Sequence, residues 1–134
     1  MKKTKVAFVC VHNSCRSQIA EALTKKFAGD SIEVYSAGTE LKDQINQDAV
    51  RLVKEMYAID MEETQRPKLL KDIPEVDYLI TMGCNVVCPI LTYTVKKDDW
   101  GLEDPSGKND EEFIKTIKEI ESRVHKLIEE VEEI

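Results

Sequence analysis

The stretch VAFVCVHNSCRSQ, residues 6–18, decides the fold. An apolar run ends at Cys10, polar residues follow, and a segment with apolar side chains at helical spacing comes next. This order predicts a buried strand over residues 5–9, a short loop, and a helix over residues 17–28. Arg16 follows Cys10 after five intervening residues. The sequence therefore places a thiol and a guanidinium on one strand–loop–helix junction.

The remainder of the chain alternates between strand and helix patterns in the same way. Short apolar runs predict two further strands, a short fourth strand is expected after them, and apolar side chains at i, i+3 and i+4 predict two further helices. The strands are expected over residues 32–37, 76–82 and 95–100, and the helices over residues 46–57 and 110–132. Residues 84–91 fit either a helical turn or a loop. The alternation predicts an α/β fold with a parallel sheet, in one domain spanning residues 1–134.

Composition limits the kinds of partner. The 134 residues carry a formal net charge of −7, which argues against nucleic acid but leaves room for a small anion held by backbone amides. No apolar run approaches the ~20 residues that span a bilayer, and the apolar run after the basic start is shorter than a signal peptide requires. We therefore expect a cytoplasmic protein with no membrane contact. Its four cysteines are then reduced, catalytic or metal-binding rather than a disulfide framework.

The loop after the first strand has the chemistry of an oxyanion site. Backbone amides and a helix N-terminus attract an anion, and the planar fork of Arg16 holds two oxygens of a tetrahedral one. The same positive potential favours the thiolate of Cys10. Asn13 suits a left-handed turn, and Ser14 and Ser17 suit donation to the thiolate or capping of the helix. The expected oxyanion-binding residues are Val11, His12, Asn13, Ser14, Cys15, Arg16 and Ser17. The alternative, a plain buried strand cysteine, does not account for Arg16 at this interval.

The segment VCVHNSCRSQ, residues 9–18, resembles the active-site loop of the low-molecular-weight tyrosine phosphatase fold. More narrowly, it is similar to that of the arsenate reductases built on this fold. The resemblance implies that Cys10 is the nucleophile, that Arg16 and the loop amides bind the oxyanion, and that the sheet has the order 2-1-3-4 with flanking helices. His12 stands where a glycine is usual. Gln18 stands where phosphatases usually carry proline, and glutamine is what the reductases show.

Two loop residues keep alternative interpretations. His12 is either a base or proton switch, or a loop residue bonded to backbone. Cys15 either forms a protective disulfide with Cys10 under oxidation or only packs.

A second candidate is Asp104 in WGLEDPSG, residues 100–107. Pro105 restricts the preceding residue and stiffens the loop, so the carboxyl group can be held over a site and can protonate a leaving oxygen. Asp-Pro is also common in plain turns. The resemblance favours the general acid, because phosphatases and reductases of this fold carry an aspartate before proline in this region. The DWG run at residues 99–101 resembles the reductases.

A third candidate is the cysteine pair in TMGCNVVCP, residues 81–89. If Cys84 and Cys88 lie on a helix they share a face, within reach of a disulfide. A thiol pair can carry an oxidation outward by thiol–disulfide exchange. The alternatives are core packing and half of a metal site, which lacks a second ligand pair nearby. Better-known thioredoxin-linked reductases have a longer interval between these two cysteines.

Together these features predict an arsenate reductase. The resemblance implies that Cys10 attacks arsenate while Asp104 helps water leave, that Cys84 then attacks Cys10, and that Cys88 resolves the disulfide. The dithiol favours thioredoxin as the reductant, and we expect a monomer. One alternative is a phosphatase that hydrolyses phosphotyrosine through a cysteinyl-phosphate intermediate. The other is a non-enzymatic arsenic- or redox-responsive binding module.

The resemblance also raises the question of a metal ion. In some reductases of this fold a potassium ion lies beside the anion loop, and the matching residues are Asn13, Glu21 and Ser36. The segment ETQRPK, residues 63–68, supplies no matching aspartate. Arg66 and Lys68 in this segment either add positive charge near the site or are only solvated.

Overall fold

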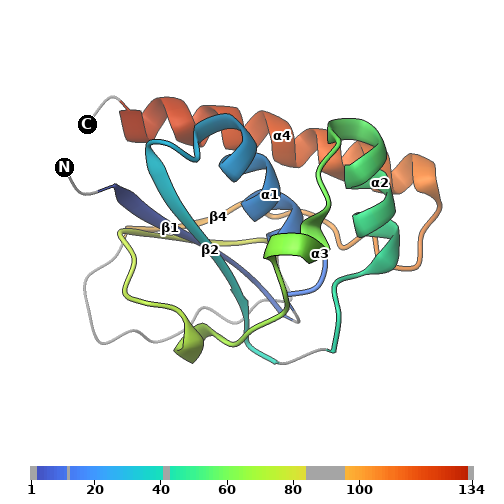
Figure 1. Cartoon of the computed structure of the whole chain (residues 1–134), viewed down its shortest axis with the longest axis horizontal. Coiled ribbons are helices and arrows are strands. Elements are labelled where there is room, and N and C mark those ends of the chain that lie inside the picture. Colours follow the sequence, from blue (N-terminus) through green and yellow to red (C-terminus); the bar gives the residue numbers. More distant parts are fainter. Residues whose placement is uncertain (1–2, 12, 41–42, 84–95, 133–134) are drawn as a thin grey trace.

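The computed structural model describes residues 3–11, 13–40, 43–83 and 96–132, and within them the predicted sheet is present. Its strands are β1 (Thr4–Cys10), β2 (Ile32–Gly38), β3 (Tyr78–Thr81) and β4 (Lys96–Asp99). All neighbouring strands are parallel and the order is β2-β1-β3-β4 (Figure 1). The predicted order 2-1-3-4 is therefore confirmed.

The three predicted helices are present with bounds within one residue of the prediction. They are α1 (Arg16–Ala28), α2 (Gln47–Tyr57) and α4 (Asp110–Glu132). Two short elements were not predicted, namely α3 (Met61–Thr64) and the 3-10 turn η1 (Leu70–Asp72). Elements of three or four residues are too short to show a helical period in the sequence. The segment 84–91, which the sequence left open, lies outside the described residues.

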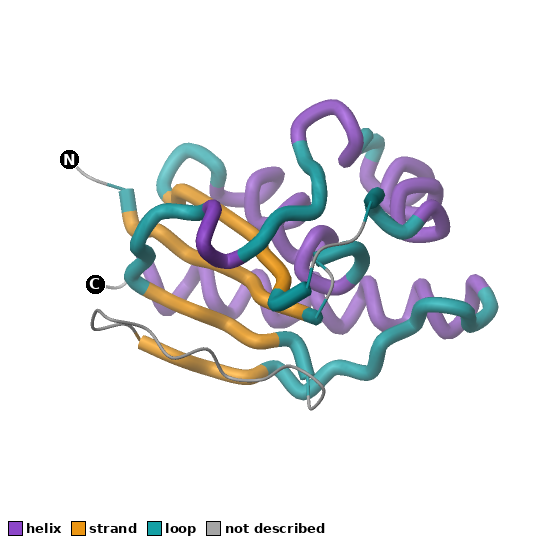
Figure 2. The backbone as a smooth tube through the Cα atoms, turned by 90° about the horizontal axis from the view of Figure 1, so that it is seen from below, coloured by secondary structure: helices purple, strands orange, loops and turns teal. Residues whose placement is uncertain are grey.

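The sheet separates a larger core from a smaller one. On β1, Val6 and Phe8 face the larger core with the apolar sides of α1 and α4, whereas Ala7 and Val9 belong to the smaller one. The strict alternation follows from the strand period of two. Leu70 of η1 packs against the smaller core, so this turn covers the face opposite the long helices. Figure 2 shows the strands in front of the longest helix, as this arrangement requires.

The arrangement fixes where a site forms. β1 lies between β2 and β3, and its last residue, Cys10, pairs with Gly38 at the end of β2. In open parallel sheets ligands bind outside the carboxyl ends of the strands. Among the described residues, no helix is both long enough and apolar enough to cross a bilayer.

Candidate active site

The thiol of Cys10 is held at the start of the β1–α1 loop by Ser17. The Cys10 sulfur and the Ser17 hydroxyl oxygen are 2.7 Å apart, and both residues are buried. The Asn13 side-chain amide donates to the same hydroxyl oxygen at 2.8 Å. Because that oxygen already accepts a hydrogen bond, the Ser17 hydrogen is available for the sulfur.

Asn13 gives the loop its shape. Its φ is 52°, in the left-handed region, so the left-handed turn predicted at this residue is confirmed. Its side-chain oxygen accepts from the Lys68 backbone N–H at 3.0 Å and from the Gln18 side chain at 3.0 Å. A completely buried side chain with all these partners holds the strained turn in place.

Gln18 ties the loop to a segment far away in sequence. Its side-chain nitrogen donates to the Asn13 carbonyl at 2.9 Å and to the Arg66 carbonyl at 3.0 Å. The side chain of Gln65 donates in turn to the Gln18 side-chain oxygen at 2.7 Å. The sequence singled out Gln18 but missed Gln65, because its partner lies 47 positions away and no local pattern marks the contact.

Arg16 is buried, with 5% of its surface exposed, and lies beside the residues that follow β3 and β4. Its Nη1 donates to the Leu102 carbonyl at 2.9 Å and to the Met82 carbonyl at 3.3 Å. Its Nε is also buried and has no hydrogen-bond partner among the described residues. A buried guanidinium with an unsatisfied N–H is an arrangement suited to receive an oxyanion.

The start of α1 corrects one expectation. Cys15 is the N-cap residue and no side chain caps the helix, so neither Ser14 nor Ser17 takes that role. Ser17 lies inside the first turn and is engaged with Cys10 and Asn13. The first-turn amides therefore keep their donor capacity without a side-chain acceptor, which suits an anion at this N-terminus.

Asp104 lies on the exposed loop before α4 and is organised by its neighbours. Its carboxylate accepts from the Ser106 backbone N–H at 3.0 Å and from the Ser106 hydroxyl at 2.7 Å. Asn46, the N-cap of α2, donates to that hydroxyl at 3.3 Å. These contacts join the Asp-Pro loop to α2, so the carboxyl group belongs to a fixed turn.

Cys15 lies close to the same groups. Burial raises the pKa of the Cys15 thiol well above its usual range, and the charges of Asp104 and Cys10 raise it further. The described structure thus brings Cys10, Cys15, Arg16 and Asp104 to one end of the sheet. A thiol that stays protonated is a poor nucleophile, so Cys15 is poorly suited to that role.

Two glycines make room for the loop, and the sequence marked neither as part of the site. A Cβ on Gly38 would lie 2.8 Å from the Val11 carbonyl oxygen. A Cβ on Gly83 would lie 2.5 Å from the Leu102 carbonyl oxygen and 2.6 Å from Nη1 of Arg16. All three distances are shorter than side-chain carbons tolerate, so these close approaches need glycine.

Glu21 and Ser36, the residues matched to a potassium site, already have other partners. The buried Glu21 carboxylate accepts from the Ser36 hydroxyl and contacts the ammonium groups of Lys25 at 2.5 Å and Lys68 at 3.6 Å. The side-chain oxygen of Asn13 accepts two N–H donors. Potassium needs several free oxygen ligands, and these residues present ammonium and N–H groups instead. The residues present do not fit the ion.

The other predicted residues divide into two groups. Val11 and Ser14 are in the loop, where their carbonyls accept from the backbone N–H groups of Glu40 and Asn46 at 2.8 and 2.7 Å. His12, Cys84 and Cys88 lie outside the described residues. Among the part of the chain that is described, no cluster of three or more metal-ligating side chains occurs.

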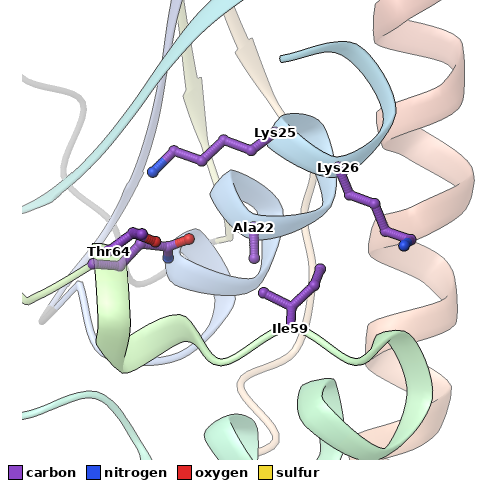
Figure 3. A pocket seen from close by; sticks show the side chains of 6 residues that line it. Ala22, Lys25, Lys26, Ile59 and Thr64 are labelled. Carbon is purple, nitrogen blue, oxygen red and sulfur yellow. The ribbon is translucent and has the colours of Figure 1, made fainter.

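A surface hollow of about 270 Å³ lies apart from the loop. Its lining residues come from α1 and from the segment 59–65, and they are Ala22, Lys25, Lys26, Ile59, Thr64 and Gln65. Figure 3 shows Lys25 and Lys26 extending from α1 in opposite directions, with Ala22 and Ile59 at the hollow. No described residue between Cys10 and Ser17 lines this hollow, so it lies apart from the described part of the loop.

This fold and this loop define a family. The model of the low molecular weight phosphotyrosine protein phosphatases matches residues 5–134, so the chain belongs to that family. Within it, the chain is 39% identical over 131 residues to an arsenate reductase of Brevibacillus brevis, covering 96% of each protein.

Two solved structures are similar over nearly all of this chain. An arsenate reductase in the phosphate binding state has a TM-score of 0.86 at 33% identity, covering 96% of this chain and 98% of that one. The thioredoxin-dependent arsenate reductase of Corynebacterium glutamicum has a TM-score of 0.79 at 36% identity. The alignment covers 97% of this chain but only 62% of the Corynebacterium chain, which is longer.

Proposed function

We propose that the protein is a thioredoxin-coupled arsenate reductase. The observation that carries the proposal is the Cys10 sulfur, 2.7 Å from the Ser17 hydroxyl on a loop that also buries the Arg16 guanidinium with a free Nε. That constellation suits a thiolate facing a tetrahedral oxyanion. The relatives named above, similar over almost the whole chain, are arsenate reductases, and one is named thioredoxin-dependent.

The first step follows from the geometry of the loop. Arsenate binds to the loop amides and to Arg16, whose charge neutralises the oxyanion. The Cys10 thiolate attacks arsenic, an As–S bond forms, and one oxygen leaves as water after gaining protons. Asp104, held by Ser106, is the proposed proton donor to that oxygen. No electrons have moved to arsenic at this stage.

The reduction itself requires the second pair of thiols. The Cys84 thiolate attacks the Cys10 sulfur, the S–As electron pair leaves with arsenic, and arsenite departs as a Cys10–Cys84 disulfide forms. The Cys88 thiolate then attacks the Cys84 sulfur, which frees Cys10 and leaves a Cys84–Cys88 disulfide. A thioredoxin dithiol reduces that disulfide and is itself oxidised. This sequence assigns one two-electron oxidation to the protein for each arsenate.

A coupled assay tests the proposal. NADPH consumption with thioredoxin and thioredoxin reductase is measured in the presence and absence of arsenate, for the wild type and for Cys10→Ser, Cys84→Ser and Cys88→Ser. We expect arsenate-dependent consumption in the wild type and loss of multiple turnover in all three variants, with circular dichroism confirming that each is folded. Full turnover by Cys88→Ser would refute the assigned shuttle.

The family match supports one alternative function. The model that matches residues 5–134 is that of phosphotyrosine phosphatases, and Cys10, Arg16 and Asp104 would equally serve a cysteinyl-phosphate intermediate. Hydrolysis of a phosphotyrosine peptide separates the two activities. Robust hydrolysis that survives Cys84→Ser, with no arsenate-dependent NADPH consumption, would favour the phosphatase. Retained arsenite binding without either turnover would indicate a binding module.

A further inference from the structure

The ion pair between Glu21 and Lys68 lies directly beside the oxyanion loop. Glu21 is on the second turn of α1 and is 3% exposed. Its carboxylate accepts a hydrogen bond from Ser36 on β2 and contacts Lys68 at 3.6 Å. A carboxylate at this depth requires a compensating positive charge. A negative charge beside an anion site also opposes binding of that anion unless it is neutralised.

Two lysines neutralise this carboxylate, and they differ in position. Lys25 is one turn farther along α1, its side chain is 39% exposed, and it lines the surface hollow of Figure 3. The Lys68 side chain is 21% exposed. Burial lowers the pKa of Lys68, and the Glu21 charge opposes that shift. Lys68 is therefore the more enclosed of the two cations.

Lys68 is also joined to the loop through its backbone. Its N–H donates to the Asn13 side-chain oxygen at 3.0 Å, and its carbonyl accepts from the Gly38 N–H at 2.8 Å. One residue thus supports the left-handed turn at Asn13, the end of β2, and the charge of Glu21. Lys25 has no corresponding link to the loop, because its ammonium group contacts Glu21 and its carbonyl accepts from the Gly29 N–H at the end of α1.

We propose that the Lys68 ammonium group is the built-in cation of the oxyanion loop, held by Glu21 where other members of the family are implied to hold potassium. Lys68 is a positioning residue: it neutralises Glu21 and fixes Asn13, and the protein needs no potassium for oxyanion binding. The inference rests on the proposed anion loop, but it does not depend on which reaction follows binding.

The test uses the full chain, inorganic phosphate and two salts of equal ionic strength, potassium chloride and choline chloride. Isothermal titration calorimetry gives the phosphate Kd, and thermal unfolding without phosphate gives the melting temperature. For the wild type we expect both values to be the same in the two salts, within about twofold for Kd. A potassium-specific rise in melting temperature, or a phosphate Kd tighter by about threefold or more in potassium, would overturn the proposal, because both report a bound ion.

Variants test the assignment to Lys68. Lys68→Met is expected to weaken phosphate binding about tenfold in both salts, which corresponds to about 1.4 kcal/mol. Lys68→Arg keeps the charge and is expected to keep the affinity within about threefold. The control is Lys71→Met, an exposed lysine of η1 that removes the same charge from the same segment. Phosphate binding by Lys68→Met equal to that of the wild type, or a loss equal to that of Lys71→Met, would refute the role.

A double variant keeps the proposal testable if Lys68→Met is unstable. In Lys68→Met the Glu21 carboxylate stays buried but has lost one of its two neutralising lysines. Removing the charge of Glu21 as well should therefore restore stability. We expect Glu21→Gln/Lys68→Met to melt above Lys68→Met, and an equal or lower melting temperature would contradict the pairing. The melting measurements need neither phosphate binding nor catalysis. A lack of arsenate reduction with these results intact would therefore count against the proposed function alone.

Discussion

Replacing Gly83 by alanine tests whether the position of Arg16 controls oxyanion binding. The new Cβ would lie 2.6 Å from Nη1 of Arg16 and 2.5 Å from the Leu102 carbonyl oxygen, which accepts from that same Nη1 at 2.9 Å. Neither approach is tolerated, so the guanidinium or the carbonyl must move and their hydrogen bond must break. Gly83 has no positive φ, so alanine adds no backbone strain of its own.

The hydrogen bond between Arg16 and the Leu102 carbonyl sets the size of the expected loss of phosphate affinity. A hydrogen bond that involves a charged group contributes about 1.5–3 kcal/mol. Phosphate binding must supply that energy to return Arg16 to its place, so we expect the affinity to fall by about ten- to 150-fold. Isothermal titration with phosphate measures this loss, and it requires neither Cys84 nor thioredoxin.

Gly101→Ala is the matched control. A Cβ there meets nothing within 4 Å, but φ is 60°, so alanine should lower stability by about 1–2 kcal/mol and leave phosphate affinity unchanged. Wild-type phosphate affinity in a folded Gly83→Ala variant would refute the reasoning, because the guanidinium would then tolerate displacement. A loss no larger than that of Gly101→Ala would have the same meaning.

Three further predictions concern groups around the site and the sheet. Cys15 should resist alkylation by iodoacetamide at pH 8 in the native protein, because burial raises the pKa of its thiol; peptide mass spectrometry showing Cys15 modified as fast as Cys10 would contradict this. Gln18→Leu should lower the free energy of unfolding in urea by about 2–4 kcal/mol, since the buried Asn13 carbonyl, the partly buried Arg66 carbonyl and Gln65 lose their partner, whereas the exposed control Gln47→Leu should cost less than about 1 kcal/mol. Burial and the hydrogen bond to Glu33 raise the pKa of the Tyr35 hydroxyl from 10.0 to about 12. The protonated hydroxyl therefore stabilises the fold fully below pH 10, and this stabilisation is lost as the pH rises toward 12. Tyr35→Phe should remove the tyrosinate absorbance that appears near pH 12 in an alkaline titration, ahead of that of Tyr57, whose pKa is raised further by burial and by the bond to Glu121; an unchanged titration would refute the assignment.

The sequence was sufficient to predict the sheet and the position of the β1–α1 loop. Strand and helix periods predicted β1, α1 and α4 to within a residue, because their apolar side chains repeat over many positions. The interval between Cys10 and Arg16 indicated an oxyanion loop, because it places a thiol and a guanidinium on one strand–loop–helix junction. α3 and η1 escaped prediction because so few residues leave no period.

The residues that support the loop could not be predicted in the same way. Gln65 contacts Gln18, and Lys68 contacts Asn13 and Glu21, although the partners in each contact lie far apart in the sequence. The segment ETQRPK, to which Gln65 and Lys68 belong, has no pattern that indicates these contacts. Positive charge at Lys68 was recognised, but solvation was an equal alternative until its carboxylate partner was located. Nothing in the sequence singled out Gly83, because its importance depends on a carbonyl nineteen positions later in the chain, at Leu102.

These distant contacts explain why the loop can hold an anion without losing its own shape. Asn13 is held in a conformation that few residues adopt, and its side-chain oxygen is engaged by Gln18 and by Lys68. The Ser17 oxygen is engaged by Asn13, which leaves its hydrogen for Cys10. These side-chain groups of the described loop are thus occupied, whereas the buried Nε of Arg16 has no described partner. A loop held by such internal hydrogen bonds need not rearrange to bind an anion, so in the proposed mechanism the binding energy is available to the chemistry at Cys10.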